Sequence, residues 1–198
     1  MDVTVIADST ADGLTSVTAQ LVGAASSIGG TTTVLCPGGV GASEAASISG
    51  VSKVISVEGD CFGTYEGGAW ATALDSQVTG ELVLAAASPR GRDIAASLAA
   101  IRKIPVIQDA TGLESGIVVT RPIYSGKAME TSNVSGPCVI TLRANAFDAA
   151  PDGGGSDVST VNQTADVGLA VKEAIAKASE RLDVTEADII ISGGRGMG

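Results

Sequence analysis

Three short stretches of the sequence combine residue types that bind anions or flat ring systems. Residues 34–43, "VLCPGGVGAS", place three glycines after an aliphatic run and before an alanine-rich stretch. In "ASPRGRD", Arg90 and Arg92 follow the most apolar run of the chain. In "ISGGRG", Arg195 offers a planar cationic fork among glycines that permit close backbone approach. These residues predict binding of a ligand or a partner.

Each stretch also has a plainer interpretation. The glycine cluster could cradle a phosphate, but it lacks the Lys-Ser/Thr pair of a P-loop, so a tight turn between strand and helix is favoured. Arg90 and Arg92 stand where α/β proteins bind ligands, yet solvated charges fit equally well. Spacing alone does not decide whether Arg195 belongs to a site or to a mobile tail. A fourth stretch, "TRPIYSGKA", carries Arg121 and Tyr124, residue types that are favoured at protein interfaces.

The sequence is poor in catalytic groups. It contains no histidine, which removes the commonest general base and the commonest metal ligand. Ser-His-Asp and Cys-His chemistry is therefore excluded, and no pair of carboxylates can be placed together. Cys36, Cys61 and Cys138 are far apart and form no CxxC motif, so we expect buried thiols in a reducing compartment. We predict no catalytic residue and no metal site.

Charge and composition narrow the class of partner. The 22 acidic and 12 basic residues give a formal net charge of -10. Such a chain repels a phosphate backbone, so we expect no nucleic-acid partner. The N-terminal "MDVTVIADST" has no basic region before a long apolar stretch, and the apolar runs are too short to cross a bilayer. We expect a cytoplasmic protein without a membrane span.

Short aliphatic runs alternate with helical patterns over the first half of the chain. The predicted strands are 3–7, 31–36, 51–58, 81–88 and 104–111. The predicted helices are 14–29, 41–50, 65–78 and 88–103. Ser88 is expected to cap the last of these helices, with Pro89 in its first turn. This order indicates an α/β fold with three layers, in which helices cover both faces of a mostly parallel sheet.

The second half of the chain follows a different pattern. Residues 116–134 lack a helix between two extended halves, which predicts a hairpin excursion beside the main sheet. Residues 138–142 form another strand. Residues 148–163 are rich in Gly, Asp and Ser and are interpreted as a surface loop or linker. Residues 164–182 have a strong helical period, and 187–194, "ADIIISGG", are expected to form the closing strand.

Several of these stretches together resemble the α subunit of electron transfer flavoprotein. The matching motifs are "TRPIYSGKA" at 120–128, "VITLRANAF" at 139–147, "DAAPDGGG" at 148–155 and "ISGGRG" at 191–196. "SPRGRDIAASLAA" followed by "IPVIQDAT" also matches, and the order and spacing agree. The resemblance covers essentially the whole chain and is strongest from about residue 81 onward.

The resemblance implies a domain organisation. Residues 1–192 would be the N-terminal α/β scaffold domain, and 193–198 would begin the junction to a C-terminal FAD-binding domain that this chain lacks. The family's cofactor residues carry over at Arg195 in its glycine setting, with Gly194 beside it. We therefore expect FAD in the full-length protein and little or no binding by this chain alone.

The resemblance also implies a function. Such a protein carries electrons in a heterodimer with a β subunit, from acyl-CoA or other dehydrogenases to a quinone oxidoreductase, and is not a catalyst of its own. Simple carriers and electron-bifurcating complexes remain equally open. One alternative is a free-standing adenine-nucleotide-binding α/β module, because the βαβα order has a glycine-rich turn. Another is an interaction domain that binds no ligand and assembles only through a subunit interface.

Overall fold

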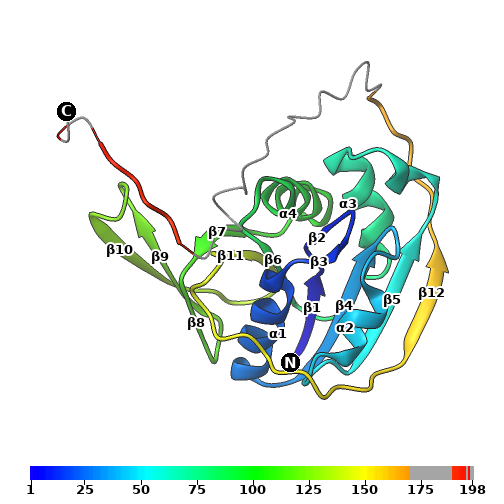
Figure 1. Ribbon diagram of the computed structural model, residues 1–198, viewed down its shortest axis with the longest axis horizontal. Helices are drawn as coiled ribbons and strands as arrows, with labels where there is room; N and C mark the ends of the chain where they lie inside the picture. The colour runs from blue at the N-terminus through cyan, green and yellow to red at the C-terminus, as the bar shows by residue number, and fades with distance from the viewer. Residues whose placement is uncertain (170–188, 195, 197–198) are drawn as a thin grey trace.

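A seven-stranded parallel sheet forms the centre of the computed structural model, which describes residues 1–169, 189–194 and 196. Its strands are β1 (Asp2–Ile6), β4 (Thr31–Pro37), β5 (Lys53–Glu58), β6 (Leu82–Ala86), β7 (Val106–Ala110), β11 (Cys138–Leu142) and β12 (Val158–Asn162). They follow the order β12-β5-β4-β1-β6-β11-β7, and every registered pair is parallel (Figure 1). The interior strand β6 is buried at all five positions, as its apolar sequence predicts.

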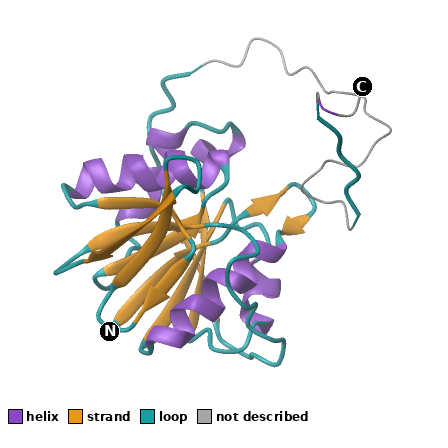
Figure 2. Ribbon diagram, turned by 90° about the vertical axis from the view of Figure 1, so that its left-hand side faces the viewer, coloured by secondary structure: helices purple, strands orange, loops and turns teal. Residues whose placement is uncertain are grey.

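Helices cover both faces of this sheet (Figure 2). On one face, α1 (Ser16–Ile28) and α2 (Ala42–Ser47) pack on a core that includes Val5 and Leu84. On the other, α3 (Gly67–Asp75) and α4 (Pro89–Arg102) pack on a core that includes Leu35 and Val83. The three-layer α/β prediction is therefore confirmed. Across the part of the chain that the structure describes, no helix combines the length and apolar character needed to cross a membrane.

Side-chain caps begin the two helices of the second face. At α4, the Ser88 hydroxyl accepts a hydrogen bond from the Gly91 N–H at 3.1 Å, and Pro89 stands in the first turn. Both predictions are confirmed. At α3, the Glu66 carboxylate accepts hydrogen bonds from the N–H groups of Gly68 and Ala69. This double cap offsets the weak helix propensity of the glycines at the start of α3.

The predicted hairpin excursion is confirmed. Strands β8 (Gly112–Glu114), β9 (Val118–Ile123) and β10 (Ala128–Asn133) form an antiparallel sheet in the order β10-β9-β8. The β9–β10 hairpin projects beyond β7, away from the opposite edge strand β12 (Figure 1). A smaller antiparallel pair, β2 (Ser9–Thr10) and β3 (Gly13–Leu14), follows β1.

The polar segment 148–163 is more ordered than a surface loop or linker, so that prediction needs correction. Residues 158–162 form β12, whose backbone pairs with β5 and whose side chains alternate between exposed and half-buried. An edge strand is held mainly by backbone hydrogen bonds and does not require apolar side chains. The polar composition of residues 158–162 therefore did not indicate a strand. The glycines let the segment lie close to α2. A Cβ on Gly154 would stand 2.3 Å from the Ile48 carbonyl oxygen.

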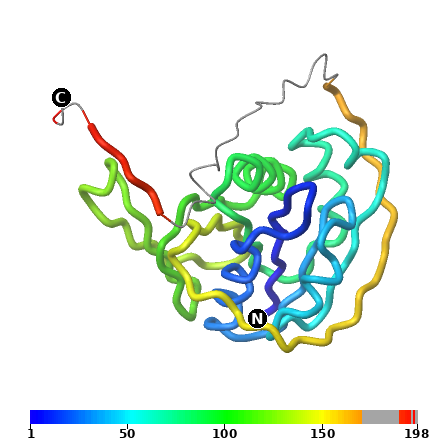
Figure 3. The backbone as a smooth tube through the Cα atoms, in the orientation of Figure 1, coloured from blue at the N-terminus to red at the C-terminus, as the bar shows by residue number. Residues whose placement is uncertain are grey.

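The elements predicted near the C-terminus either differ from the structure or fall on residues that the structure does not describe. Of the predicted helix 164–182, the described residues 164–169 have no regular secondary structure, and the remainder lies outside the described residues. The predicted strand 187–194 is wrong over 189–194, which runs outside the sheet (Figure 3). Ile189 is 82% exposed and Ile191 is 95% exposed. An aliphatic triplet favours burial, but none of the described strands pairs with this segment.

The cysteines lie where the sequence predicts. Cys36, Cys61 and Cys138 are all buried and free. Burial raises the pKa of the Cys36 thiol to about 12, with a smaller contribution from the charge of Glu44. Burial alone raises the pKa of Cys138 to about 11. Both thiols therefore stay protonated near neutral pH and act as small apolar side chains.

Candidate functional site

The candidate site lies at the carboxyl ends of the central strands. After β1 the chain moves to β4 and β5 on one side, and it then returns to β6 on the other side of β1. Open α/β sheets bind ligands in the crevice above such a reversal of strand order. Asp8 follows β1 there, and Ser88 and Arg90 follow β6. The charges and hydrogen bonds of these three residues therefore determine which ligands can bind in the crevice.

Asp8 fills the position where a phosphate would be expected. Its carboxylate accepts hydrogen bonds from the hydroxyls of Thr15 and Ser88, both at 2.9 Å. Thr15 is the N-cap of α1 and Ser88 is the N-cap of α4. Helix N-termini favour a negative charge, and here the chain supplies that charge itself. A ligand phosphate would have to displace or repel Asp8, which argues against a nucleotide phosphate in this crevice.

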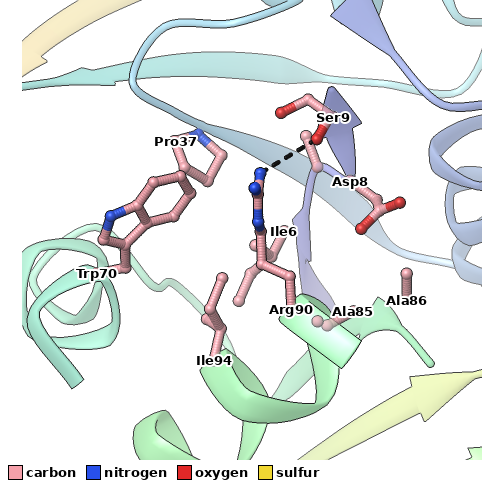
Figure 4. Close-up of a pocket in the computed structure, with 11 residues that line it drawn as sticks. Ile6, Asp8, Ser9, Pro37, Trp70, Ala85, Ala86, Arg90 and Ile94 are labelled. Carbon is pink, nitrogen blue, oxygen red and sulfur yellow. Dashed lines mark hydrogen bonds between the residues drawn. The ribbon is translucent and has the colours of Figure 1, made fainter. Parts of the chain in front are cut away.

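Arg90 lies across the crevice on a platform of aromatic rings. Its guanidinium carbon is 5.0 Å from the ring centre of Tyr65 and 5.3 Å from that of Trp70. The guanidinium also donates a hydrogen bond to the Ser9 carbonyl oxygen at 3.3 Å. Figure 4 shows this side chain between Trp70 and Pro37 on one side and Ser9 on the other. Arg90 is therefore held in place by cation–π contacts, although its side chain remains exposed.

Arg90 separates two spaces of very different size. The cavity beside Ile6 and Ile94 has a volume of about 10 Å³, which is enough for one water molecule. On the other side an open cleft of about 680 Å³ extends over the ends of β4, β5 and β12. This volume lies within the range of small-molecule sites. Phe62, Tyr65 and Trp70 line the cleft together with the carboxylates of Glu58 and Asp60.

The second arginine of "ASPRGRD" belongs to a separate charged cluster. Arg92 approaches the Asp109 carboxylate at 3.2 Å, and Arg143 binds the same carboxylate with two hydrogen bonds of 3.1 and 2.6 Å. Asp109, the penultimate residue of β7, has a left-handed conformation with φ 65°, which non-glycine residues seldom adopt. The hydrogen bond from Arg143 is the main cause that lowers the pKa of Asp109. Arg90 and Arg92 thus each make specific contacts within the chain, and both side chains also remain partly or fully accessible to solvent.

The Asp109 cluster predicts a dependence of stability on pH. Because its pKa is lowered by folding, Asp109 stabilises the protein above its unfolded pKa of about 4 and loses that effect as the pH falls through the folded pKa. We expect Asp109→Asn to lower the free energy of unfolding by about 1 kcal/mol at pH 7. Urea unfolding between pH 2 and 7 should show this difference shrinking toward acid pH. Asp12→Asn, at an exposed carboxylate, is the control, and an equal effect of both variants would contradict the assignment.

The glycine cluster 34–43 forms the tight turn that its sequence favours. Gly38 and Gly39 both have positive φ angles. The Gly38 N–H donates to the Val57 carbonyl and the Gly39 N–H donates to the Cys36 carbonyl. These donors are occupied within the chain, so they are not available to a phosphate. A Cβ on Gly41 would stand 2.5 Å from the Leu14 side chain, which shows that the turn is also closely packed.

The "TRPIYSGKA" stretch forms the tip and one strand of the β9–β10 hairpin. Arg121 is paired with Glu130 across the two strands at 2.5 Å. Tyr124 in the turn is 77% exposed, and Met129 at the start of β10 is 58% exposed. The predicted role of this stretch as an interface stays a prediction, and Tyr124 within it and Met129 directly after it face solvent.

The residues expected to contact a cofactor stand apart from this site. Gly194 lies in the exposed segment 189–194, and a Cβ placed on it would meet none of the described atoms within 4 Å. Arg195 lies outside the described residues. The structure therefore does not bring Gly194 together with Arg90 or Asp109, and the cofactor role of both residues stays a prediction.

Sequence reasoning missed the aromatic wall and the Asp109 cluster. The chain has one Trp, two Tyr and two Phe, and three of these residues fall within 62–70, which is a clustering that could have been noticed. No comparable signal marks Asp109. Only the order of the sheet brings β7 beside β11 and thereby Asp109 to Arg143.

Comparison with known proteins agrees with the fold. A family model of the electron transfer flavoprotein domain matches residues 3–187. The electron transfer flavoprotein subunit alpha of Pseudomonas aeruginosa is 36% identical over 213 residues, covering 100% of this chain and 66% of the relative. That of Paracoccus denitrificans is 33% identical, covering 91% of this chain and 60% of the relative. That of Syntrophomonas wolfei is 34% identical, covering 74% of this chain and 50% of the relative. The chain thus spans 66% or less of the length of these relatives, and it belongs to the electron transfer flavoprotein family.

Proposed function

We propose that this chain is the scaffold part of an electron transfer flavoprotein α subunit. Residues 1–192 form the scaffold and dock a β subunit, and 193–198 begin the junction to an FAD-binding domain. The observation that carries this proposal is the match to α subunits whose own length extends well beyond the matched region. The three-layer fold and the projecting hairpin support it, because they supply a rigid body with an exposed docking element.

The β9–β10 hairpin is the surface that best fits a protein partner. Within the described residues β10 pairs only with β9, so its other edge exposes backbone donors and acceptors. Tyr124 and Met129 expose large side chains beside that edge, and both residue types are enriched at interfaces. A β subunit that covers this surface would bury apolar area and pair with the free edge.

Arg195 and Gly194 are proposed to border the flavin. Gly194 lies in an open, exposed segment, so a flat ring can approach its backbone without meeting a Cβ. The Arg195 guanidinium would complement a phosphate or an electron-rich ring. When bound, FAD supplies the redox chemistry, and the protein supplies binding and orientation. This division fits a chain without histidine that carries electrons from acyl-CoA or other dehydrogenases to a quinone oxidoreductase and catalyses no reaction of its own.

Titration with FAD tests the cofactor proposal. Flavin fluorescence should change little when the 198-residue chain is added, because two residues at a junction make too few contacts for tight binding. A longer chain that continues into an FAD-binding domain should bind FAD stoichiometrically, and Arg195→Ala should weaken that binding about tenfold or more. Tight stoichiometric binding by the 198-residue chain would contradict the proposal.

A charge placed on the hairpin should weaken docking. We expect Met129→Glu to reduce affinity for an electron transfer flavoprotein β subunit at least tenfold, because it buries an unpaired carboxylate in the proposed contact. Ile101→Glu is the matched control, since Ile101 is 43% exposed at the end of α4, away from the hairpin. Titration calorimetry would measure both. Equal loss in the two variants, or loss only in the control, would place the interface elsewhere.

A further inference from the structure

The open cleft beside Arg90 has features that the electron-carrier proposal does not use. It lies over the carboxyl ends of β4, β5 and β12 and has a volume of about 680 Å³. Three of the five aromatic residues of the chain line it. We propose that this cleft binds a neutral ribonucleoside, that is, a flat heterocycle carrying a vicinal diol but no phosphate.

One wall of the cleft suits a flat heterocycle. The Trp70 ring meets the Phe62 ring edge-to-face at 5.2 Å and the Tyr65 ring at 5.1 Å. The Tyr65 hydroxyl donates a hydrogen bond to the Asp93 carboxylate at 2.9 Å, which fixes the ring. Arg90 lies on this platform and is itself exposed to the cleft. A heterocycle that stacks on the guanidinium plane would continue the existing stack, as arginine does with bases in other proteins.

Two carboxylates in the lining of the cleft suit a pair of hydroxyl groups. Glu58 ends β5, and Asp60 follows two residues later at the start of the 3₁₀ helix η1 (Asp60–Gly63). Both side chains are exposed in the cleft. The Ser56 hydroxyl donates to one Glu58 oxygen at 3.1 Å, and the Asp60 carboxylate accepts no hydrogen bond from any described residue. Carboxylates at strand ends are well suited to accept hydrogen bonds from the hydroxyls of a ribose.

The charges of the cleft disfavour a phosphate. Among the described residues, the charged side chains that line it are Glu58, Asp60 and Arg90, so two negative charges and one positive charge leave a balance of −1. Arg90 already interacts with Tyr65, Trp70 and the Ser9 carbonyl. The N–H groups of Gly38 and Gly39 at the rim donate to backbone carbonyls. Phosphates added to the ribose would therefore meet two carboxylates and few available donors.

The single tryptophan of the chain makes the proposal directly measurable. Trp70 lines the cleft, so its fluorescence reports on a ring bound there. We expect adenosine to change this fluorescence saturably, AMP to bind several-fold more weakly and ATP more weakly still, with larger differences at low salt. We expect 2′,3′-dideoxyadenosine to bind about tenfold more weakly than adenosine, because two hydroxyl donors to carboxylates are lost.

Two substitutions separate the diol contact from general charge effects. Glu58→Gln and Asp60→Asn together should weaken the binding of adenosine about tenfold. They should also reduce the difference in affinity between adenosine and AMP. The double variant Glu81→Gln, Glu114→Gln is the matched control, since it also removes two exposed carboxylates and both lie outside the cleft. Circular dichroism would confirm that all variants fold, and calorimetry would provide a second measure of binding.

Three results would overturn the assignment. The first is tighter binding of AMP or ATP than of adenosine, which would indicate a phosphate site. The second is the absence of any saturable signal in both fluorescence and calorimetry. The third is unchanged adenosine affinity in the Glu58→Gln, Asp60→Asn double variant. None of these results depends on FAD or on Arg195. Failure of this proposal can therefore be distinguished from failure of the electron-carrier proposal.

Discussion

Replacing Leu84 by alanine is expected to lower the free energy of unfolding by about 2–5 kcal/mol. Leu84 lies in the interior strand β6 and is fully buried. Its register neighbours are Val5 on β1 and Ile140 on β11, and all three face the core beneath α1. A rigid sheet with strands on both sides cannot collapse into the cavity that the substitution leaves, so the cost should fall in the upper part of the range.

Urea unfolding at pH 7 would measure this effect. The control is Leu169→Ala, because Leu169 is 63% exposed and should change stability by less than about 0.5 kcal/mol. A loss at Leu84 no larger than that at Leu169 would contradict the interior position of β6 between β1 and β11. A lower slope of the unfolding transition, without a shift of its midpoint, would instead point to loss of cooperativity.

The second large effect is expected at Gly91, where local propensity and tertiary packing give opposite predictions. Gly91 lies in the first turn of α4, and helix propensity alone favours alanine there by about 1 kcal/mol. In the structure a Cβ on Gly91 would stand 2.2 Å from the carbonyl oxygen of Ala86, a backbone atom at the end of β6. We therefore expect Gly91→Ala to destabilise the protein by about 1–3 kcal/mol.

This close approach also positions the candidate site. It holds the N-terminus of α4 against the end of β6, and Arg90 is the residue immediately before Gly91. Gly91→Ala should consequently shift the emission of Trp70, because Arg90 stacks on that ring. Gly63→Ala is the control for the stability measurement, since a Cβ there would meet none of the described atoms within 4 Å. Stabilisation by Gly91→Ala would show that α4 does not pack so closely.

Much of the fold could be predicted from the sequence because its signals are local. Five-residue aliphatic runs such as Leu82–Ala86 identify parallel strands that are buried on both faces. The Ser-Pro pair before α4 marks a helix start, since capping involves only the residues next to it. The hairpin at 116–134 could also be predicted from local sequence, because two extended halves without an intervening helix pair with each other.

The errors concern segments whose state depends on distant partners. Residues 158–162 are polar, and they form a strand because β5 offers an open backbone edge. Residues 189–191 are apolar, and they are exposed because none of the described strands pairs with them. Composition predicts burial from the side chains alone. Membership of a sheet depends on backbone hydrogen bonds that only the arrangement of the strands provides.

The sequence by itself determined the α/β class, the absence of histidine-based chemistry, and the family to which the chain belongs, because each of these follows from residue types and local order. The tertiary structure decided what occupies the carboxyl edge of the sheet. It placed Asp8 between two helix caps, stacked Arg90 on Tyr65 and Trp70, and joined Asp109 to Arg143. These contacts connect residues far apart in the chain, and they form only when parallel strands bring their ends together at one edge.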